Sequence, residues 1–357
     1  FIYGQPDTRQ FPLATWRSAA NWLHGGVRDP AWVIDHIDQD VPMLIEQIRT
    51  RVLPKRGIVA APDEILITLG SQNALYLLTQ LLLSSTTRIG VENPCFREAI
   101  NTFLLADAEV VPHPVDEEGI VLNERPCDYY YVTPGHQVPT GVTMSSARRR
   151  QLLEHAARHD AVIIEDDYDS ESNFTLNPLP ALKASDRSGR VVYVSSLSKA
   201  LSPGLRLGFM VADPDLIDEA RALRRLVYRH PPTNIQYQMA HFLAQGHYET
   251  HLRRYHYDSA QRWERLHAAL QRYLPSCRAL AGSEHANAFW LQTPAQINTQ
   301  QLTWRAAHAG VLIEPGARHF LNAAPPDNYF RMGFHAINPD AIAQGVEVLR
   351  GQLEQMG

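Results

Sequence analysis

The sequence predicts an α/β protein with a mostly parallel central sheet, helices on both faces of that sheet, and a smaller C-terminal α+β domain. Short apolar runs alternate with amphipathic segments between residues 64 and 212, and a long, charge-rich helical stretch follows after about residue 231. The chain has 357 residues, 45% of them hydrophobic, which is enough for a large core. We expect an N-terminal arm and helix at 1–40, a large domain at 41–235 and a small domain at 236–357.

The first half of the chain gives the elements of the large domain in order. Turn-forming residues fill 1–12, and apolar residues at helical spacing predict helices at 13–23 and 41–53. Strands are then expected at 64–70, 88–93, 108–115, 127–135, 161–169, 190–198 and 206–212, with helices at 71–83, 95–105 and 145–160. Parallel strands joined in this way place their carboxyl ends at one edge of the sheet, where such proteins bind ligands.

The second half predicts helical structure over 234–274, strands at 286–292, 310–316 and 329–335, and a terminal helix at 338–356. In the third of these strands the period-two pattern puts Phe330, Met332 and Phe334 on one face and Arg331 on the other. That arrangement is consistent with an arginine that faces a cleft.

The composition excludes several classes of protein. The net charge is -5 with no long basic run, so this chain is not expected to bind nucleic acid by itself. Three scattered cysteines predict no disulfide framework and favour a reducing, cytoplasmic compartment. No apolar run is long enough to span a bilayer, and no His-Glu-x-x-His or paired-cysteine motif indicates a metal site.

The segment "SLSK", at the end of a predicted strand, places Lys199 between hydroxyl groups. Ser196 and Ser198 flank it, and Arg206 follows inside an apolar run, where a charged group needs an anionic partner. Upstream, Ser71 and Gln72 lie at a strand-to-helix turn whose backbone N–H groups favour an anion. The alternatives are a solvated turn lysine and an ordinary helix N-terminus.

A second group of residues adds a carboxylate and a phenol to the lysine and the anion site. Asp166 and Tyr168 share one face of a strand, although each could also begin a solvated loop. A primary amine, a carboxylate and an anion site together match pyridoxal 5'-phosphate. Lys199 would form the Schiff base and Asp166 would keep the ring nitrogen protonated. Phe96 would stack on the ring, unless it belongs to the core.

The motifs occur in a family-specific order. This order resembles that of fold type I pyridoxal phosphate enzymes of the aspartate aminotransferase kind, through "GSQNAL", "ENPCF", "TPGHQVPTG", "EDDYDSE", "SLSK", "GLRLGF" and "FRMGF". A closer resemblance is to the aminotransferase-like domain of MocR-type transcriptional regulators, through "FIYGQPDTRQFPLATWR" and "GHYETHLRRYHYDSAQRWERL". The two resemblances together cover nearly the whole chain.

The resemblance implies roles for individual residues. Tyr168 would bond the phenolic oxygen of the cofactor, and Arg331 would grip an effector carboxylate through two parallel bonds. The residues that would hold the phosphate are Ser71, Gln72, Ser196, Ser198 and Arg206.

The resemblance also implies partners. A winged helix-turn-helix preceding Phe1 would bind DNA, and this domain would form a homodimer and sense a small amine or amino acid. Turnover is in doubt because Val138 stands where aminotransferases carry asparagine, and Phe96 where tyrosine is frequent. A free-standing amino acid aminotransferase and a scaffold that has lost the cofactor are the alternatives.

Overall fold

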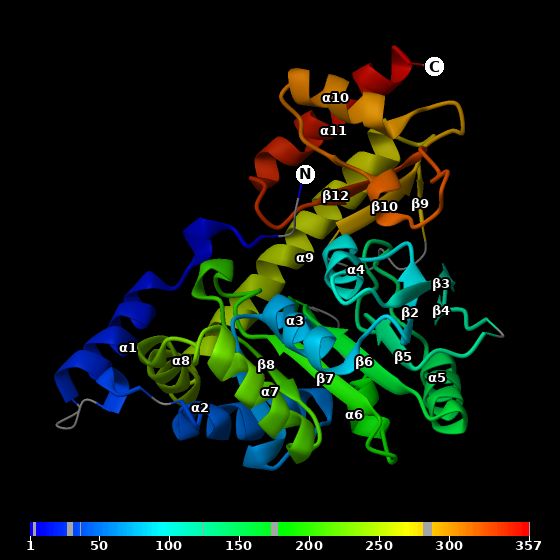
Figure 1. Ribbon diagram of the computed structural model, residues 1–357. Coiled ribbons are helices and arrows are strands. Elements are labelled where there is room, and N and C mark those ends of the chain that lie inside the picture. The colour runs from blue at the N-terminus through cyan, green and yellow to red at the C-terminus, as the bar shows by residue number, and fades with distance from the viewer. Residues whose placement is uncertain are drawn as a thin grey trace.

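The computed structural model describes residues 1–2, 5–26, 31–35, 37–123, 125–172, 178–280 and 288–356. Two sheets organise the chain, and the long helix α9 runs from one to the other (Figure 1). The helices are α1 (Leu13–Gly26), α2 (Pro42–Gln47), α3 (Ser71–Leu82), α4 (Arg97–Leu104), α5 (Ser146–His159), α6 (Leu182–Ser185), α7 (Pro214–Val227), α8 (Thr233–Ala244), α9 (His247–Tyr273), α10 (Thr299–His308) and α11 (Ile342–Glu354).

The large sheet has eight strands in the order β1-β8-β7-β6-β5-β2-β3-β4. The pairs β2–β3, β2–β5, β5–β6 and β6–β7 are parallel, and β8 runs antiparallel to both of its neighbours. Its strands are β1 (Ile65–Thr68), β2 (Arg88–Asn93), β3 (Glu109–Asp116), β4 (Gly119–Ile120), β5 (Tyr129–Val132), β6 (Val162–Asp167), β7 (Val191–Ser196) and β8 (Gly208–Val211). This arrangement confirms the predicted fold class.

Helices cover both faces of the large sheet, as alternate residues of β1 illustrate. Ile65 and Ile67 pack into a cluster with α2 and α8, whereas Leu66 packs into a second cluster with α3 and α4. Because successive side chains of a strand point to opposite faces, a strand buried on both sides needs an unbroken apolar run. The sequence of β1, "ILIT", meets this requirement.

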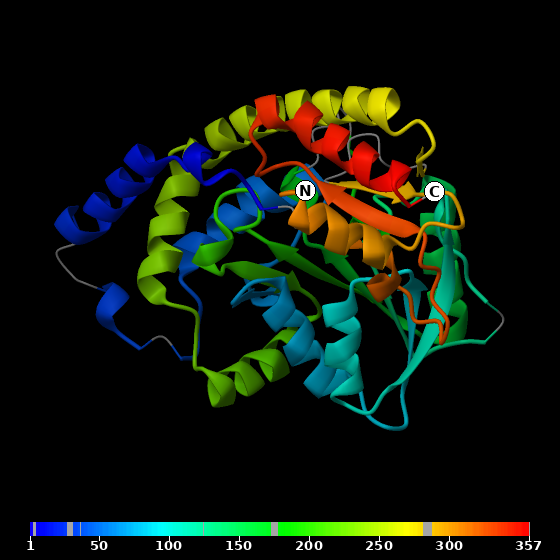
Figure 2. The same cartoon turned by 90° about the horizontal axis from the view of Figure 1, so that it is seen from above.

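The small sheet is antiparallel, with the strand order β11-β12-β10-β9. Its strands are β9 (Arg278–Ala279), β10 (Ala288–Gln292), β11 (Glu314–Pro315) and β12 (Tyr329–Gly333). As predicted, Phe330, Met332 and Phe334 pack together in the core beneath α9, α10 and α11, and Arg331 lies on the other face. Figure 2 shows α9 and α11 side by side above this sheet.

Several expected elements differ in extent. The stretch 234–274 is two helices, because Gly246 adopts φ +71° between α8 and α9. The strand expected at 310–316 is reduced to the two residues of β11, and residues 286–287 of another expected strand lie outside the described residues. The helix α8 packs against α1 and α2 on the side of the large sheet. The domain limits at 40 and 235 stay predictions.

The first residue of the chain lies against the small domain. The carbonyl oxygen of Phe1 accepts a hydrogen bond from the backbone N–H of Gly333 at 3.0 Å, at the end of β12. A Cβ added to Gly345 of α11 would lie 2.6 Å from the Phe1 ring, so the aromatic ring rests directly on that helix. Figures 1 and 2 both show this end of the chain beside β12.

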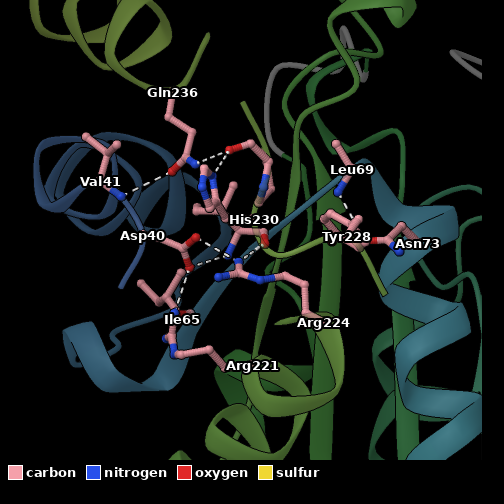
Figure 3. A network of polar contacts seen from close by, with 12 residues as sticks. Asp40, Val41, Ile65, Leu69, Asn73, Arg221, Arg224, Tyr228, His230 and Gln236 are labelled. Carbon is pink, nitrogen blue, oxygen red and sulfur yellow. Dashed lines mark hydrogen bonds and ion pairs between the residues drawn. The ribbon is translucent and has the colours of Figure 1, made fainter. Parts of the chain in front are cut away.

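A buried ionic network closes the edge of the large sheet at β1 (Figure 3). Asp40 accepts bonds from Nη1 of Arg224 at 2.7 Å, from Nη1 of Arg221 at 3.0 Å and from the backbone N–H of Ile67 at 3.1 Å. Arg224 also donates to the carbonyl oxygen of Ile67 at 2.6 Å. The outward backbone groups of an edge strand are thus satisfied by side chains, which protects the strand from pairing with another chain.

We expect Asp40→Ala to lower the free energy of unfolding by about 3–5 kcal/mol, because it leaves the buried Arg224 guanidinium without its acid. Asp38→Ala is the matched control, since Asp38 pairs at 3.3 Å with Arg225 while both side chains are exposed. Its effect should stay within about 0.5 kcal/mol. Chemical denaturation of both variants measures the difference. Equal midpoints for the two would show that Asp40 does not stabilise the edge of the sheet at β1.

Candidate cofactor-binding site

A cavity of about 440 Å³ lies at the carboxyl ends of the parallel strands, with the small sheet on its other side. Its walls bring together residues from most of the length of the chain. They include all ten site residues inferred from the sequence: Ser71, Gln72, Phe96, Asp166, Tyr168, Ser196, Ser198, Lys199, Arg206 and Arg331. The predicted site residues therefore converge in space, and their individual roles stay predictions.

The N-terminus of α3 forms one end of the cavity. Gly70 precedes the helix with φ +84°, and a Cβ at this position would lie 2.9 Å from Nη2 of Arg206. Glycine therefore lets the guanidinium lie against the start of the helix, where Nη2 donates to the carbonyl oxygen of Leu69 at 2.8 Å. Ser71 and Gln72 begin the helix. A helix N-terminus beside an arginine favours an anionic group.

Lys199 follows β7 in a serine-rich turn. The hydroxyl of Ser198 donates to the carbonyl oxygen of Leu207 at 3.2 Å and lies 3.4 Å from the hydroxyl of Ser196. This turn places Lys199, half-buried, in the cavity wall, with Nζ 5.5 Å from the centre of the Tyr168 ring. A primary amine in a sheltered cavity can act as a nucleophile toward a carbonyl group.

Asp166 lies at the end of β6 and is buried. Its Oδ2 accepts a hydrogen bond from the hydroxyl of Tyr131 at 2.9 Å, and its Oδ1 has no hydrogen-bond partner among the described residues. Burial raises the pKa of Asp166 to about 7; the neighbouring Asp167 raises it as well, whereas the Tyr131 hydrogen bond and the charge of Lys199 lower it. A cationic group beside Oδ1 would stabilise the ionised carboxylate.

The two aromatic site residues differ in how they are held. Phe96 precedes α4 and is partly buried against the core of the large sheet. Tyr168 donates its hydroxyl hydrogen to the carbonyl oxygen of His136 at 3.3 Å. The contact predicted between Tyr168 and a cofactor oxygen would therefore require the phenol to exchange or share this hydrogen bond.

The turn around Val138 is fixed by a buried glutamine. Nε2 of Gln137 donates to the carbonyl oxygens of Pro94 and Val138, both at 2.7 Å, and Oε1 accepts from the Thr140 hydroxyl at 2.6 Å. Gln137 thus points into the protein, whereas Val138 lines the cavity. The position at which aminotransferases carry an asparagine accordingly presents an apolar side chain to the cavity.

The end of the cavity opposite α3 is rich in charge. Arg331 of β12 lies 3.3 Å, Nη1 to Oε2, from Glu314 of β11. Arg318 and His319, from the 3-10 helix Gly316–His319, lie 3.7 Å and 3.4 Å from the other oxygen of Glu314. Nε of Arg331 is buried and has no hydrogen-bond partner among the described residues, which leaves a donor to meet a ligand.

Five polar residues of the cavity wall are not among the ten inferred from the sequence: Glu98, Tyr131, Glu314, Arg318 and His319. Tyr131 could have been found, because it lies near the end of an apolar strand that runs beside the strand of Asp166. Glu314 lies in an apolar run before a Pro-Gly pair, where a buried acid is itself a signal. Glu98 and His319 carry no such local signal.

Within the described residues, no group of three or more histidine, cysteine, aspartate and glutamate side chains could hold a metal ion. None of the helices in that part of the chain combines the length and apolar composition needed to cross a bilayer.

Sequence comparison identifies the family. The model of the family described as aminotransferase class I and II matches residues 38–348. The chain is 38% identical over 350 residues to the HTH-type transcriptional regulator TauR of Rhodobacter capsulatus, covering 97% of this chain and 72% of the relative. It is 32% identical over 358 residues to the probable rhizopine catabolism regulatory protein MocR of Rhizobium meliloti, covering 98% and 71%.

Structural comparison agrees with this result. The structure is similar to that of Pyrococcus horikoshii kynurenine aminotransferase in complex with PMP, with a TM-score of 0.91 and 26% sequence identity, covering 99% of this chain and 90% of that one. The resemblance inferred from the motifs is thereby confirmed. The chain belongs to the aminotransferase class I and II family, as an aminotransferase-like domain of the kind found in MocR-type transcriptional regulators.

Proposed function

We propose that this chain is the pyridoxal phosphate-binding, effector-sensing and dimerisation domain of a MocR-type transcriptional regulator. The observation that carries the proposal is the placement, in one cavity, of a lysine amine, a buried carboxylate with an unpartnered oxygen, and an anion site at a helix N-terminus. When bound, pyridoxal phosphate supplies an aldehyde that condenses with primary amines and a ring that withdraws electrons.

The described residues fit this cofactor by charge. Oδ1 of Asp166 has no hydrogen-bond partner within the described part of the chain, and a protonated ring nitrogen would provide one and keep the carboxylate ionised. The start of α3, the serine hydroxyls and Arg206, which the absence of a side chain at Gly70 lets lie against that helix end, would hold the phosphate. Phe96 would lie against the ring, and Lys199 would be the amine that reacts with the aldehyde.

The effector would be a small amine with an acidic group. Lys199 and the cofactor select for a primary amine, since only that group can replace the lysine amine. Arg331, with its buried and unpartnered Nε, would bind a carboxylate or a sulfonate. Amino acids, including β- and γ-amino acids, and amino sulfonates share this chemistry.

Control of DNA binding would belong to another part of the protein. TauR and MocR are named as regulators, and each extends beyond the length that this chain matches. We expect the gene to encode a basic winged helix-turn-helix upstream of Phe1, and the product to be a cytoplasmic homodimer. Reading the coding sequence upstream of Phe1 and measuring the mass of the protein in solution check these two expectations.

A second function, a free-standing amino acid aminotransferase, is favoured by the overall similarity to kynurenine aminotransferase. Val138 in the cavity wall weighs against it, because the turn offers no side-chain amide to the cofactor. Repeated turnover of an amino donor and a keto acid would support the enzyme. A spectral response to amino acids without sustained turnover would support the regulator.

Lys199→Ala should abolish the visible absorbance band that the protein acquires with pyridoxal phosphate, because the covalent link to the aldehyde is lost. Borohydride reduction and peptide mapping of the wild type should place the pyridoxyl group on Lys199. The chain has only two other lysines, Lys55 and Lys183, so Lys183→Ala serves as a control that should keep the band. A wild-type adduct at Lys55 or Lys183 would overturn the assignment.

The Asp166→Asn variant should show a pH-dependent change in stability. Because burial raises the pKa of Asp166 from 3.8 to about 7, this carboxyl destabilises the cofactor-free fold increasingly as the pH rises between those values. The variant should therefore gain stability over the wild type, and gain more at about pH 8 than at about pH 5. Thermal unfolding at both pH values measures the difference.

The neighbouring residue provides the control for this experiment. Asp167→Asn removes an acid that pairs with Arg56 at 2.7 Å, so it should destabilise the protein at both pH values. Added pyridoxal phosphate should raise the unfolding temperature of the wild type more than that of Asp166→Asn. A difference between Asp166→Asn and wild type that does not change with pH would contradict the role given to this carboxylate.

A further inference from the structure

Glu314 lies among three basic side chains at the end of the cavity opposite α3. It is the direct cross-strand neighbour of Arg331, so both side chains project from the same face of the small sheet. Its carboxylate oxygens lie 3.3 Å from Arg331, 3.4 Å from His319 and 3.7 Å from Arg318. An effector's acidic group would have to approach the same cations.

The carboxylate is charged but loosely held. Burial raises the pKa of Glu314, but the contacts with His319 and Arg331 outweigh it and lower the pKa to about 2. None of its three contacts is as short as the 2.7 Å of the buried pairs Arg56–Asp167 and Arg224–Asp40. Charge-assisted hydrogen bonds are normally about 2.7–2.9 Å long, so these contacts leave room for a better acceptor.

Arg331, the cross-strand neighbour of Glu314, also keeps an unused donor. Nε of Arg331 and Nε2 of His319 are buried and have no hydrogen-bond partner among the described residues that meets normal geometry. Nδ1 of His319 lies 3.1 Å from the carbonyl oxygen of Cys95, which can only accept, so this contact holds the ring in place. Arg331 thus keeps one unused donor beside a weakly bound acid, Glu314.

We propose that Glu314 is a specificity-determining residue, an internal counter-ion of Arg331 with which the acidic group of the effector competes. The inference rests on the proposed function, because it takes Arg331 as the anion contact of an amine effector. Glu314 then weakens binding of amines that carry an acidic group and does not affect amines that lack one. It sets the concentration of the amino acid at which the domain responds.

The test compares Glu314→Gln with wild type, both loaded with pyridoxal phosphate, by titration of the cofactor absorbance. The probes are β-alanine, 4-aminobutanoate and taurine, and the control ligands are propylamine and butylamine, which lack the acidic group. The variant should lower the half-saturating concentration of at least one acidic probe about tenfold or more, since it removes a nearby negative charge. The half-saturating concentrations of the two alkylamines should change by less than about twofold.

Glu98→Gln is the matched control variant. Glu98 lines the same cavity but contacts only the half-exposed Arg318, at 3.9 Å, in the part of the chain that the structure describes. Its removal should change every half-saturating concentration by less than about twofold. Thermal unfolding and the absorbance of the loaded cofactor establish that both variants are folded and occupied.

The outcomes separate the inference from the proposed function. Unchanged or weaker binding of the acidic probes by Glu314→Gln overturns the inference, and so does an equal change for alkylamines. Equal effects of Glu314→Gln and Glu98→Gln would show a general charge effect and also overturn it. A wild type whose absorbance responds to none of the amines overturns the proposed function, and the inference with it.

Discussion

The buried carboxylate of Asp166, one oxygen of which finds no hydrogen-bond partner among the residues that the structure describes, is the constraint on which the site depends. A charge in such a place is costly unless an opposite charge meets it. The parallel neighbours β5, β6 and β7 place Tyr131, Asp166 and the turn of Lys199 side by side. The cavity therefore holds a buried acid together with basic side chains, among them Lys199, Arg206 and Arg331, and a complementary ligand carries both cationic and anionic groups.

The parts of the molecule that could be predicted from sequence are those encoded locally. Apolar runs such as that of β1 identified the buried strands, and the rule that ligands gather at the carboxyl ends of parallel strands pointed to Asp166 and Lys199. The role of Arg331 came from the family resemblance instead. The helix α10 was missed because its sequence is mostly polar, and the break at Gly246 because the flanking pattern stays helical. Glu314 was missed because Arg331, its nearest basic neighbour, lies on another strand. Only Arg318 and His319 are close to it in sequence.

The polar side chains that fix the shape of the site do so through tertiary contacts, and Gln137, next to Val138, is an example. Gln137 is buried and bonds to three backbone or hydroxyl groups around the turn. It also donates to Glu92 at 3.3 Å, a buried acid whose pKa burial raises to about 7. The turn is thus held from beneath by a glutamine, and the residue facing the cavity is Val138. As a result, the side chain at position 138 offers no hydrogen-bond donor to the cavity.

The position of Phe1 links two parts of the chain that are far apart in sequence. Its carbonyl oxygen is bonded to the backbone of Gly333, two residues beyond Arg331 on the same strand, and its ring rests on α11. Strand β12 therefore carries the guanidinium of Arg331 at its middle residue and the backbone group that holds Phe1 at its last residue. A displacement of this strand would move both contacts together.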